Sequence, residues 1–411
     1  MMNRKWTAKA FASMVLSLML MCVCTFAMAE DVTIPIVNIT SEGPLTDWVS
    51  KEDVRDAVLS FEDPATGNAF TREITIQPQG SSSLYYPKKN FTIKMKEEGV
   101  EVVPAWGVQK KYCFKANYVD PTHACNIVSA RLAAQMNERY GLHAGTPNHG
   151  AIDGFPIWVT LNGEPAGLYT WNIPKDEWLF AMDGENENHI VMCGEAHSPG
   201  VYFQTDYYEL DDEWAVEVGG NNSKTVEKYA RLVRFVNTST DEEFVRDFDQ
   251  YLNLDACLNY YVFMILSLGH DNDSKNMLMV TYDGLVWYPT LYDLDSLWGI
   301  SSDGRSEAEG DVGWLIYSQN RLFERIRQNF GLKMVERYHE LRSDILSAEN
   351  IWGQFVAFRN AVPAEYFEQD AAMWNPTGEL IRSYERMDQL MDAYIPVLDE
   401  YFAYKPAAKG E

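Results

Sequence analysis

The sequence predicts an α+β fold with a β-rich first half and a mainly helical second half. From Val32 to about Trp171, apolar residues occur mostly in short alternating runs, which is the period of half-buried strands. After about residue 224, apolar residues recur at three- and four-residue spacing, which is the period of amphipathic helices. One segment with strand character, residues 276–293, returns inside the helical half.

Short strand-like segments make up most of the first half. They are VTIPIVNI (32–39), REITIQ (72–77), NFTIKM (90–95), KYCFKANY (111–118) and PIWVTLNGEPAGLYTWNI (156–173). The last segment has Asn162-Gly163 between two alternating runs and therefore predicts a hairpin. One helix interrupts the series over residues 126–141, where apolar side chains recur at helical spacing and Gly141 ends the pattern.

The second half begins with three predicted helices, over residues 225–239, 240–252 and 254–269. Thr240 or Asp241 is the expected N-cap of the second, because acidic residues follow in its first turn. The segment NMLMVTYDGLVWYPTLYD (276–293) predicts a hairpin that turns at Asp283-Gly284. Roughly the last hundred residues have helical patterns throughout.

The N-terminus has the three parts of a secretory signal peptide. Arg4, Lys5 and Lys9 precede an apolar run over about residues 11–26, and Ala-Met-Ala at 27–29 is a small-residue cleavage site. We therefore expect residues 1–29 to be removed and the protein to be secreted or held at the cell surface; an uncleaved membrane anchor is the alternative. No other stretch approaches the roughly 20 apolar residues of a membrane span, so we expect no stable span after cleavage.

Charge and cysteine content exclude several classes of protein. The formal net charge is −26, and such a surface repels nucleic acid, so we expect no nucleic-acid partner. Four cysteines, Cys113, Cys125, Cys193 and Cys257, follow the leader. They are too sparse for a disulfide scaffold and match no zinc spacing. A Cys113–Cys125 pair and buried free thiols both remain compatible with the sequence.

Two acidic clusters flank the predicted hairpin of the second half. Asp271 and Asn276 precede it, and Asp293 and Asp295 follow the far strand. The hairpin brings Asn276 and Asp293 to the same end, where carboxylate and amide oxygens form a site that Mg²⁺ or Mn²⁺ accepts together with substrate phosphates. The competing interpretation is structural, since Asp and Asn at strand ends are often turn formers and caps.

A second candidate for phosphate chemistry lies in the first half, in QGSSSLYYPKKNFTIKM (79–95). Gly80, Ser81, Ser82 and Ser83 form a loop whose backbone N–H groups and hydroxyls can donate to phosphate. Lys88 and Lys89 then lead into a strand. Lys89 has the same parity as the apolar residues of that strand, so we expect it to be the inward lysine, either snorkelling or paired with an anion.

Taken in order, several stretches resemble the spore-coat protein H (CotH) kinases, a family of atypical secreted or coat-associated protein kinases. They are residues 79–95, KANYVDPTHACNIVSARLAAQM (115–136), PIWVTLNGEPAGLY (156–169), the spacing Asp-x-x-x-x-Asn (271–276) and Asp-Leu-Asp (293–295). The resemblance covers most of the chain after the leader. It implies a two-lobed, reduced kinase-like fold, with a β-rich N-terminal lobe over 30–173 and a mainly helical C-terminal lobe over 174–411.

The resemblance also implies roles for individual residues. Lys89, or else Lys88, would bind the nucleotide phosphates, and Asp271 would position or deprotonate the acceptor hydroxyl. Asn276 and Asp293 would bind the metal, with Asp295 as the competing choice. Asn117, Tyr118 and Asp120 match a family motif and are expected to support the site. Three departures stand out: Gln79 and Cys125 replace arginines usual in the family, and Ile173 lies near the place of a usual acid.

The resemblance therefore predicts an exported kinase that transfers the γ-phosphoryl group of ATP to Ser or Thr of protein substrates, with Mg²⁺ or Mn²⁺. Two alternatives compete with it. One is a secreted glycosidase or carbohydrate-binding protein, which the 12 Trp and 23 Tyr and the paired carboxylates also suit. The other is a surface adhesin, or a degenerate family member, whose acidic loops bind Ca²⁺. Only the kinase hypothesis uses both the lysine strand and the acidic hairpin.

Overall fold

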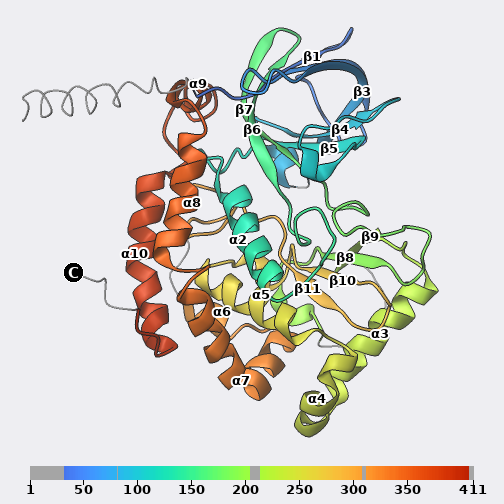
Figure 1. Ribbon diagram of the computed structural model, residues 1–411, viewed down its shortest axis with the longest axis vertical. Coiled ribbons are helices and arrows are strands. Elements are labelled where there is room, and N and C mark those ends of the chain that lie inside the picture. The colour runs from blue at the N-terminus through green and yellow to red at the C-terminus, as the bar shows by residue number, and fades with distance from the viewer. Residues whose placement is uncertain (1–31, 81, 204–212, 308–311, 407–411) are drawn as a thin grey trace, which may run out of the picture.

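A computed structural model describes residues 32–80, 82–203, 213–307 and 312–406. The expected signal peptide and Ser81 lie outside these ranges. The fold is mixed α+β, with a β-rich N-terminal region and a helical C-terminal region, as the periodicity predicts. Figure 1 shows the strands of the first region gathered at one end of the molecule and most helices of the second region toward the other end.

The N-terminal region is a closed barrel of seven strands in the order β1-β2-β3-β4-β5-β7-β6. Neighbouring strands are antiparallel except β1 and β6, which pair in parallel and close the barrel. The strands are β1 (Ile36–Thr40), β2 (Arg55–Glu62), β3 (Ala69–Gln79), β4 (Asn90–Met95), β5 (Lys111–Lys115), β6 (Gly154–Leu161) and β7 (Glu164–Asn172).

Alternating side chains fill the barrel interior. Trp171 of β7 is fully buried, and its ring contacts those of Phe61, Phe114 and Phe155, with centroids 4.7 to 6.0 Å apart. The predicted β6–β7 hairpin is confirmed: Asn162 and Gly163 both have positive φ, +51° and +86°, as a tight hairpin turn requires.

A second sheet lies between the barrel and the helices (Figure 1), in the order β11-β10-β8-β9. Its strands are β8 (Ile190–Gly194), β9 (Trp214–Val218), β10 (Leu278–Thr281) and β11 (Tyr288–Thr290). The β10–β11 hairpin, with Leu278 opposite Thr290 and Asp283-Gly284 in the connection, confirms the hairpin predicted in the second half. All five residues of β8 are buried, so this strand has no alternating pattern.

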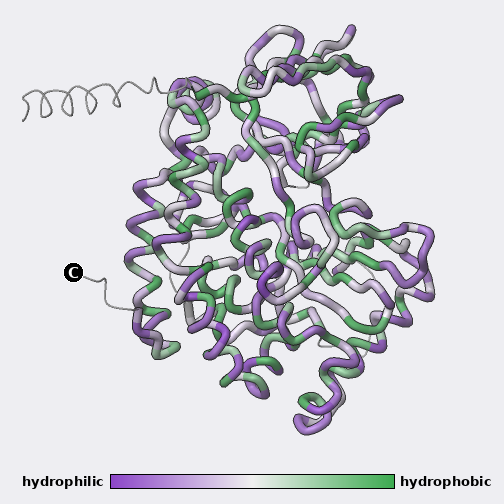
Figure 2. Tube along the Cα trace, viewed as in Figure 1, coloured by the Kyte–Doolittle hydropathy of each residue, from purple (hydrophilic) through white to green (hydrophobic). Residues whose placement is uncertain are grey.

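The helices follow the predicted order. They are α2 (Cys125–Arg139), α3 (Ser223–Thr238), α4 (Asp241–Asp247), α5 (Leu254–Leu266), α6 (Val312–Ile316), α7 (Arg321–Arg342), α8 (Ala348–Asn360), α9 (Ala364–Trp374) and α10 (Tyr384–Tyr401). Thr240, rather than Asp241, is the N-cap of α4 and forms a capping box with Glu243. Every residue of α5 from Ala256 onwards is buried, whereas Figure 2 shows hydrophilic residues along the peripheral helices α4 and α10.

Helix α9, from the C-terminal part of the chain, packs against the barrel, beside which it lies in Figure 1. Trp374 Nε1 donates to the Ala166 carbonyl of β7 at 2.9 Å, and the Tyr366 ring packs on Trp158 of β6 at 5.0 Å. The barrel and the helical region are thus connected by contacts far apart in sequence. Within the described ranges, no helix is both long enough and apolar enough to cross a bilayer.

Candidate functional site

The acidic residues on both sides of the β10–β11 hairpin lie near one end of it. Asp271 opens a short 3₁₀ helix after α5, and Asn276 lies two residues before β10. Asp293 lies three residues after β11. Leu278 pairs with Thr290, and this register, continued beyond the two strands, sets Asn276 opposite Tyr292, the neighbour of Asp293. Asp271, Asp293 and Asp295 act on one another electrostatically, so these three carboxylates lie close together. The role of Asn276 in the site stays a prediction.

The carboxylates in this cluster repel one another. Burial raises the pKa of Asp271, and the nearby negative charge of Asp293 raises it further. Burial and the same Asp293 charge raise the pKa of Asp295 to about 7. Carboxylates that are desolvated and close to like charge are typical of sites that bind a cation or transfer a proton.

Two of these residues have an unusual backbone conformation. Asn276 has φ of +66° and Asp293 has φ of +54°, which is the left-handed region that residues other than glycine seldom adopt. Such conformations cost free energy and persist only where the surroundings hold them. Here they set the direction of the two side chains expected to bind metal.

A lysine that we did not predict contacts the acidic cluster. Lys115, the last residue of β5, places its Nζ 3.7 Å from Asp293 Oδ1, and only 12% of its side chain is exposed. The Lys115 charge also acts to lower the pKa of Asp295. Sequence periodicity contained no signal for this role, although Lys115 opens the motif stretch KANYVD.

The two lysines expected to bind phosphate are engaged in contacts with other groups. The prediction that Lys89 is the inward lysine is wrong: Lys88 is 1% exposed, whereas Lys89 is half-buried. Strand β4 begins only at Asn90, so its parity does not extend to Lys89. The Lys88 ammonium binds Asp370 Oδ1 at 2.6 Å and the Leu168 carbonyl at 2.5 Å.

Lys89 and the loop before it form a local structure. Lys89 Nζ donates to the carbonyls of Leu84, at 2.6 Å, and of Tyr86. Ser83 Oγ donates to the Gln79 carbonyl at 3.1 Å. Gly80 has φ of +106°, and a Cβ there would lie 2.0 Å from Ser83 Oγ, so the turn requires glycine. Ser82 is exposed at the start of a short 3₁₀ helix, Ser82–Tyr85.

The loop and the acidic cluster meet at a small cavity. Its lining includes Ser83 and Tyr86 from the loop, Lys88, Lys115 from β5, and Asp295. Its volume is about 20 Å³, which is room for about one water molecule. A nucleotide would therefore have to displace the loop or the side chains that line this cavity.

Helix α2 holds the loop that contains Asp293 and Asp295. Asn126 Oδ1 accepts a hydrogen bond from the Leu294 amide at 3.1 Å, and Cys125 Sγ donates to the Leu294 carbonyl at 3.2 Å. Asp120 Oδ2 accepts from the Cys125 amide at 2.9 Å at the start of α2. Asn117 Nδ2 donates to Thr170 Oγ1 of β7 at 3.1 Å. These contacts agree with supporting roles for Asn117 and Asp120.

The donor set suits a hard divalent cation. Among the described residues, no group of three or more His, Cys, Asp or Glu side chains is arranged to hold a metal ion. Asn272 and Asn276 add amide oxygens in the segment that contains Asp271. Asn272 Oδ1 is buried with no hydrogen-bond donor in the described part of the chain. Buried, mutually repelling carboxylates with an unpaired amide oxygen nearby fit Mg²⁺ or Mn²⁺.

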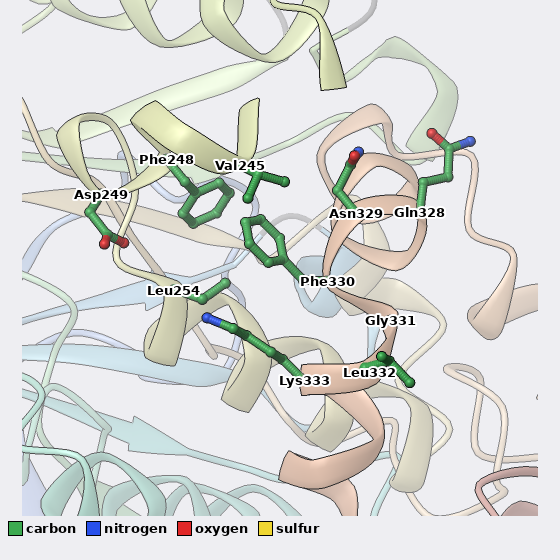
Figure 3. A pocket seen from close by; sticks show the side chains of 10 residues that line it. All are labelled: Val245, Phe248, Asp249, Leu254, Gln328, Asn329, Phe330, Gly331, Leu332 and Lys333. Atoms are coloured by element: carbon green, nitrogen blue, oxygen red, sulfur yellow. The ribbon is translucent and has the colours of Figure 1, made fainter. Parts of the chain in front are cut away.

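A larger pocket lies away from these residues. It has a volume of about 690 Å³ and lies between the end of α4 and the middle of α7 (Figure 3). There α7 is interrupted at Phe330, whose φ and ψ are −122° and 20°. None of the predicted site residues lines this cavity, so its size does not mark the site.

Comparison with known proteins supports the family seen in the motifs. A family model described as CotH kinase protein matches residues 76–400, which is most of the chain. The match contains every residue predicted for the site and also Lys115. A search of curated proteins found no match.

Proposed function

The chain belongs to the CotH kinase family, and on that premise we propose that it is an exported, metal-dependent kinase. It transfers the γ-phosphoryl group of ATP to Ser or Thr side chains of secreted or surface proteins. One observation carries the proposal: the acids on both sides of the β10–β11 hairpin converge opposite a lysine of the barrel, with Lys115 Nζ 3.7 Å from Asp293 Oδ1. Phosphoryl transfer needs such a pairing of acids with a cation.

In the proposed reaction, Asp271 accepts the proton of the acceptor hydroxyl. The hydroxyl oxygen forms a bond to the γ-phosphorus while the bond from that phosphorus to the β,γ-bridging oxygen breaks, and the hydroxyl proton passes to the Asp271 carboxylate. The raised pKa of Asp271, from burial and from Asp293, makes it a better proton acceptor than an ordinary aspartate.

The nucleotide side of the site belongs to Asn276, Asp293 and Asp295. These residues would hold Mg²⁺ or Mn²⁺, which supplies charge neutralisation on the phosphate oxygens when bound. Lys115 adds a second positive charge from the barrel side, and its ion pair with Asp293 keeps it oriented toward the cluster.

The loop of residues 80–83 contributes hydrogen-bond donors to the proposed site. We expect Gly80, Ser82 and Ser83 to donate from backbone N–H groups and hydroxyls to the phosphates, and we expect the same of Ser81, which lies outside the described residues. Lys89 sets the shape of this loop through the carbonyls of Leu84 and Tyr86, and it reaches a phosphate only if nucleotide binding breaks those bonds. Lys88 is held by Asp370 and also lines the small cavity together with Lys115 and Asp295.

The departures at Gln79, Cys125 and Ile173 keep a second candidate open: a catalytically degenerate member that binds metal or glycan at the cell surface. The test is incubation of the chain from residue 30 with γ-labelled ATP, Mg²⁺ or Mn²⁺ and a Ser-rich acceptor peptide. Asp271→Asn and Asp293→Asn should each abolish labelling, whereas Asp392→Asn, at an exposed acid of α10, should not. A wild-type chain that neither transfers label nor gains thermal stability with ATP would refute the kinase and favour the degenerate member.

A further inference from the structure

A buried arginine from the C-terminal part of the chain contacts the acidic loop. Arg382 lies two residues before α10, and its side chain has no solvent exposure. Its Nη1 donates to the Asp295 carbonyl, and its Nη2 lies 3.5 Å from the Ile300 carbonyl. One planar guanidinium therefore reaches two carbonyls of the segment that follows Asp293.

The counter-charge of Arg382 comes from the start of α2. Arg382 Nε lies 4.0 Å from Asp120 Oδ1, and Asp120 itself is 1% exposed. The same Asp120 fixes the amide of Cys125, whose thiol binds the Leu294 carbonyl. Arg382 and the first turn of α2 thus form one connected support beneath residues 294 and 295.

The acidic loop needs such a support. The segment 293–298 begins and ends with a residue in the left-handed region, since Asp293 has φ of +54° and Trp298 has φ of +63°. Such backbone conformations cost free energy. Trp298 Nε1 is fixed by Ser129 Oγ at 2.8 Å, and Leu294 is fixed on both sides by α2. The Trp298 amide also donates to the Ser267 carbonyl at 2.7 Å. Arg382 adds its contacts with the carbonyls of Asp295 and Ile300.

We propose that Arg382 is a positioning residue for the metal-binding acids: its guanidinium fork holds the carbonyls of Asp295 and Ile300 and thereby orients the carboxylates of Asp293 and Asp295 toward one cation. The proposal rests on the proposed function for the identity of the site, but it concerns metal binding and not phosphoryl transfer. A lysine cannot replace the fork, because its single ammonium does not bridge two carbonyls in a fixed plane.

The test compares Arg382→Lys with Arg342→Lys. Arg342 is a second buried arginine, paired with Asp399 between α7 and α10, so its replacement reports the general cost of losing a buried guanidinium. Mn²⁺ binding to each chain is measured by electron paramagnetic resonance without nucleotide. Arg382→Lys should bind Mn²⁺ at least about tenfold more weakly, as expected when a residue that orients metal ligands is lost. Arg342→Lys should bind like wild type.

A kinetic measurement separates positioning from general loosening. Arg382→Lys should raise the Mn²⁺ concentration for half-maximal transfer while kcat at saturating metal is largely retained. Wild-type Mn²⁺ affinity in folded Arg382→Lys, or equal weakening in both variants, would overturn the proposal. If Arg382→Lys does not fold, Arg382→Gln, which keeps a planar donor, takes its place with the same expectations. Mn²⁺ binding by wild type without any transfer would instead remove the kinase and leave the role of Arg382 intact.

Discussion

Lys115 Nζ lies 3.7 Å from Asp293 Oδ1, and this contact joins the barrel to the acidic loop of the helical region. The two side chains differ in exposure, 12% for Lys115 and 32% for Asp293, so the lysine is the more enclosed partner. A cation held at an acidic site in a chain of net charge −26 is a local exception to the field of the whole protein. An anionic substrate, such as the ATP of the proposed reaction, needs that exception.

Lys115→Met should therefore lower kcat/KM for ATP. We expect a loss of about a hundredfold, the usual effect of removing one group that stabilises transition-state charge. Initial rates of peptide phosphorylation at varied ATP concentration measure the effect, and circular dichroism checks the fold.

Two other lysine variants show whether this effect is specific. Lys94→Met, at an exposed position of β4, should leave kcat/KM unchanged. Lys89→Met should change KM for ATP less than Lys115→Met, because Lys89 binds loop carbonyls. A larger loss in Lys89→Met than in Lys115→Met would restore Lys89 as the phosphate ligand.

The Lys88–Asp370 pair predicts a large effect on stability. Burial raises the pKa of Asp370, but the charges and hydrogen bonds of Lys88 and His123 outweigh burial and lower it to about 2. Lys88→Met leaves this carboxylate without its main partner, and the free energy of unfolding should fall by about 3–5 kcal/mol. Urea unfolding measures it.

A double variant tests the cause of that loss. Lys88→Met with Asp370→Asn should recover more than half of it, because no unpaired charge stays buried and Asn can still accept from the Leu168 amide. Lys224→Met, which breaks an exposed pair with Glu187, is the control and should change little. A double variant no more stable than Lys88→Met would show that packing, and not charge, is responsible.

Asp273 predicts a pH dependence of stability. Its carboxyl is 1% exposed; burial raises its pKa from the ordinary 3.8 to about 7, although Ser318 and Ser274 bond to it. Between these values the unfolded chain loses the proton while the folded chain keeps it. Stability should therefore fall as pH rises from about 4 to about 7, by up to about 4 kcal/mol, and then level off.

Asp273→Asn removes this titration. The difference in unfolding free energy between about pH 5 and about pH 8 should shrink in the variant and persist in the exposed control Asp392→Asn. Urea unfolding at both values provides the comparison. An unchanged pH slope in Asp273→Asn would mean that another group causes it.

The four cysteines of the described chain predict a simple chemical result. Cys113, Cys125, Cys193 and Cys257 are all buried and free, and burial raises the pKa of the Cys125 thiol to about 12. A maleimide reagent should label them only after denaturation, and a reductant should leave the melting temperature unchanged. Rapid labelling of the native protein would contradict the burial of the thiols, and a reductant-sensitive melting temperature would contradict their free state.

The fold was predictable where a residue pattern has a local cause. Asn162-Gly163 and Asp283-Gly284 each set a hairpin, and Gly141 follows a helix that begins one residue earlier than expected. Strands β2, β8 and β9 were not predicted. Strand β8 is buried on both faces and shows no alternation, and β9 begins at Trp214 beside residues outside the described ranges. Closure of the barrel through the β1–β6 pair depends on contacts far apart in sequence.

The proximity of three acids was predictable from the sequence, but the cations beside them were not. Asp271, Asp293 and Asp295 stand in polar clusters on the two sides of a predicted hairpin, and they act on one another electrostatically. Lys115 and Arg382 reach the same loop from a barrel strand and from the C-terminal segment, and no spacing along the chain relates them to it.

The contact between Lys88 and Asp370 also orders events while the chain is made. All seven barrel strands leave the ribosome before α9 is synthesised. Asp370 belongs to α9, which packs on β7, so the Lys88 ammonium lacks this counter-ion until that helix docks. We expect α9 to dock on the barrel late in folding. A chain that ends before α9 would leave this part of the barrel uncovered, a ready substrate for chaperones and proteases.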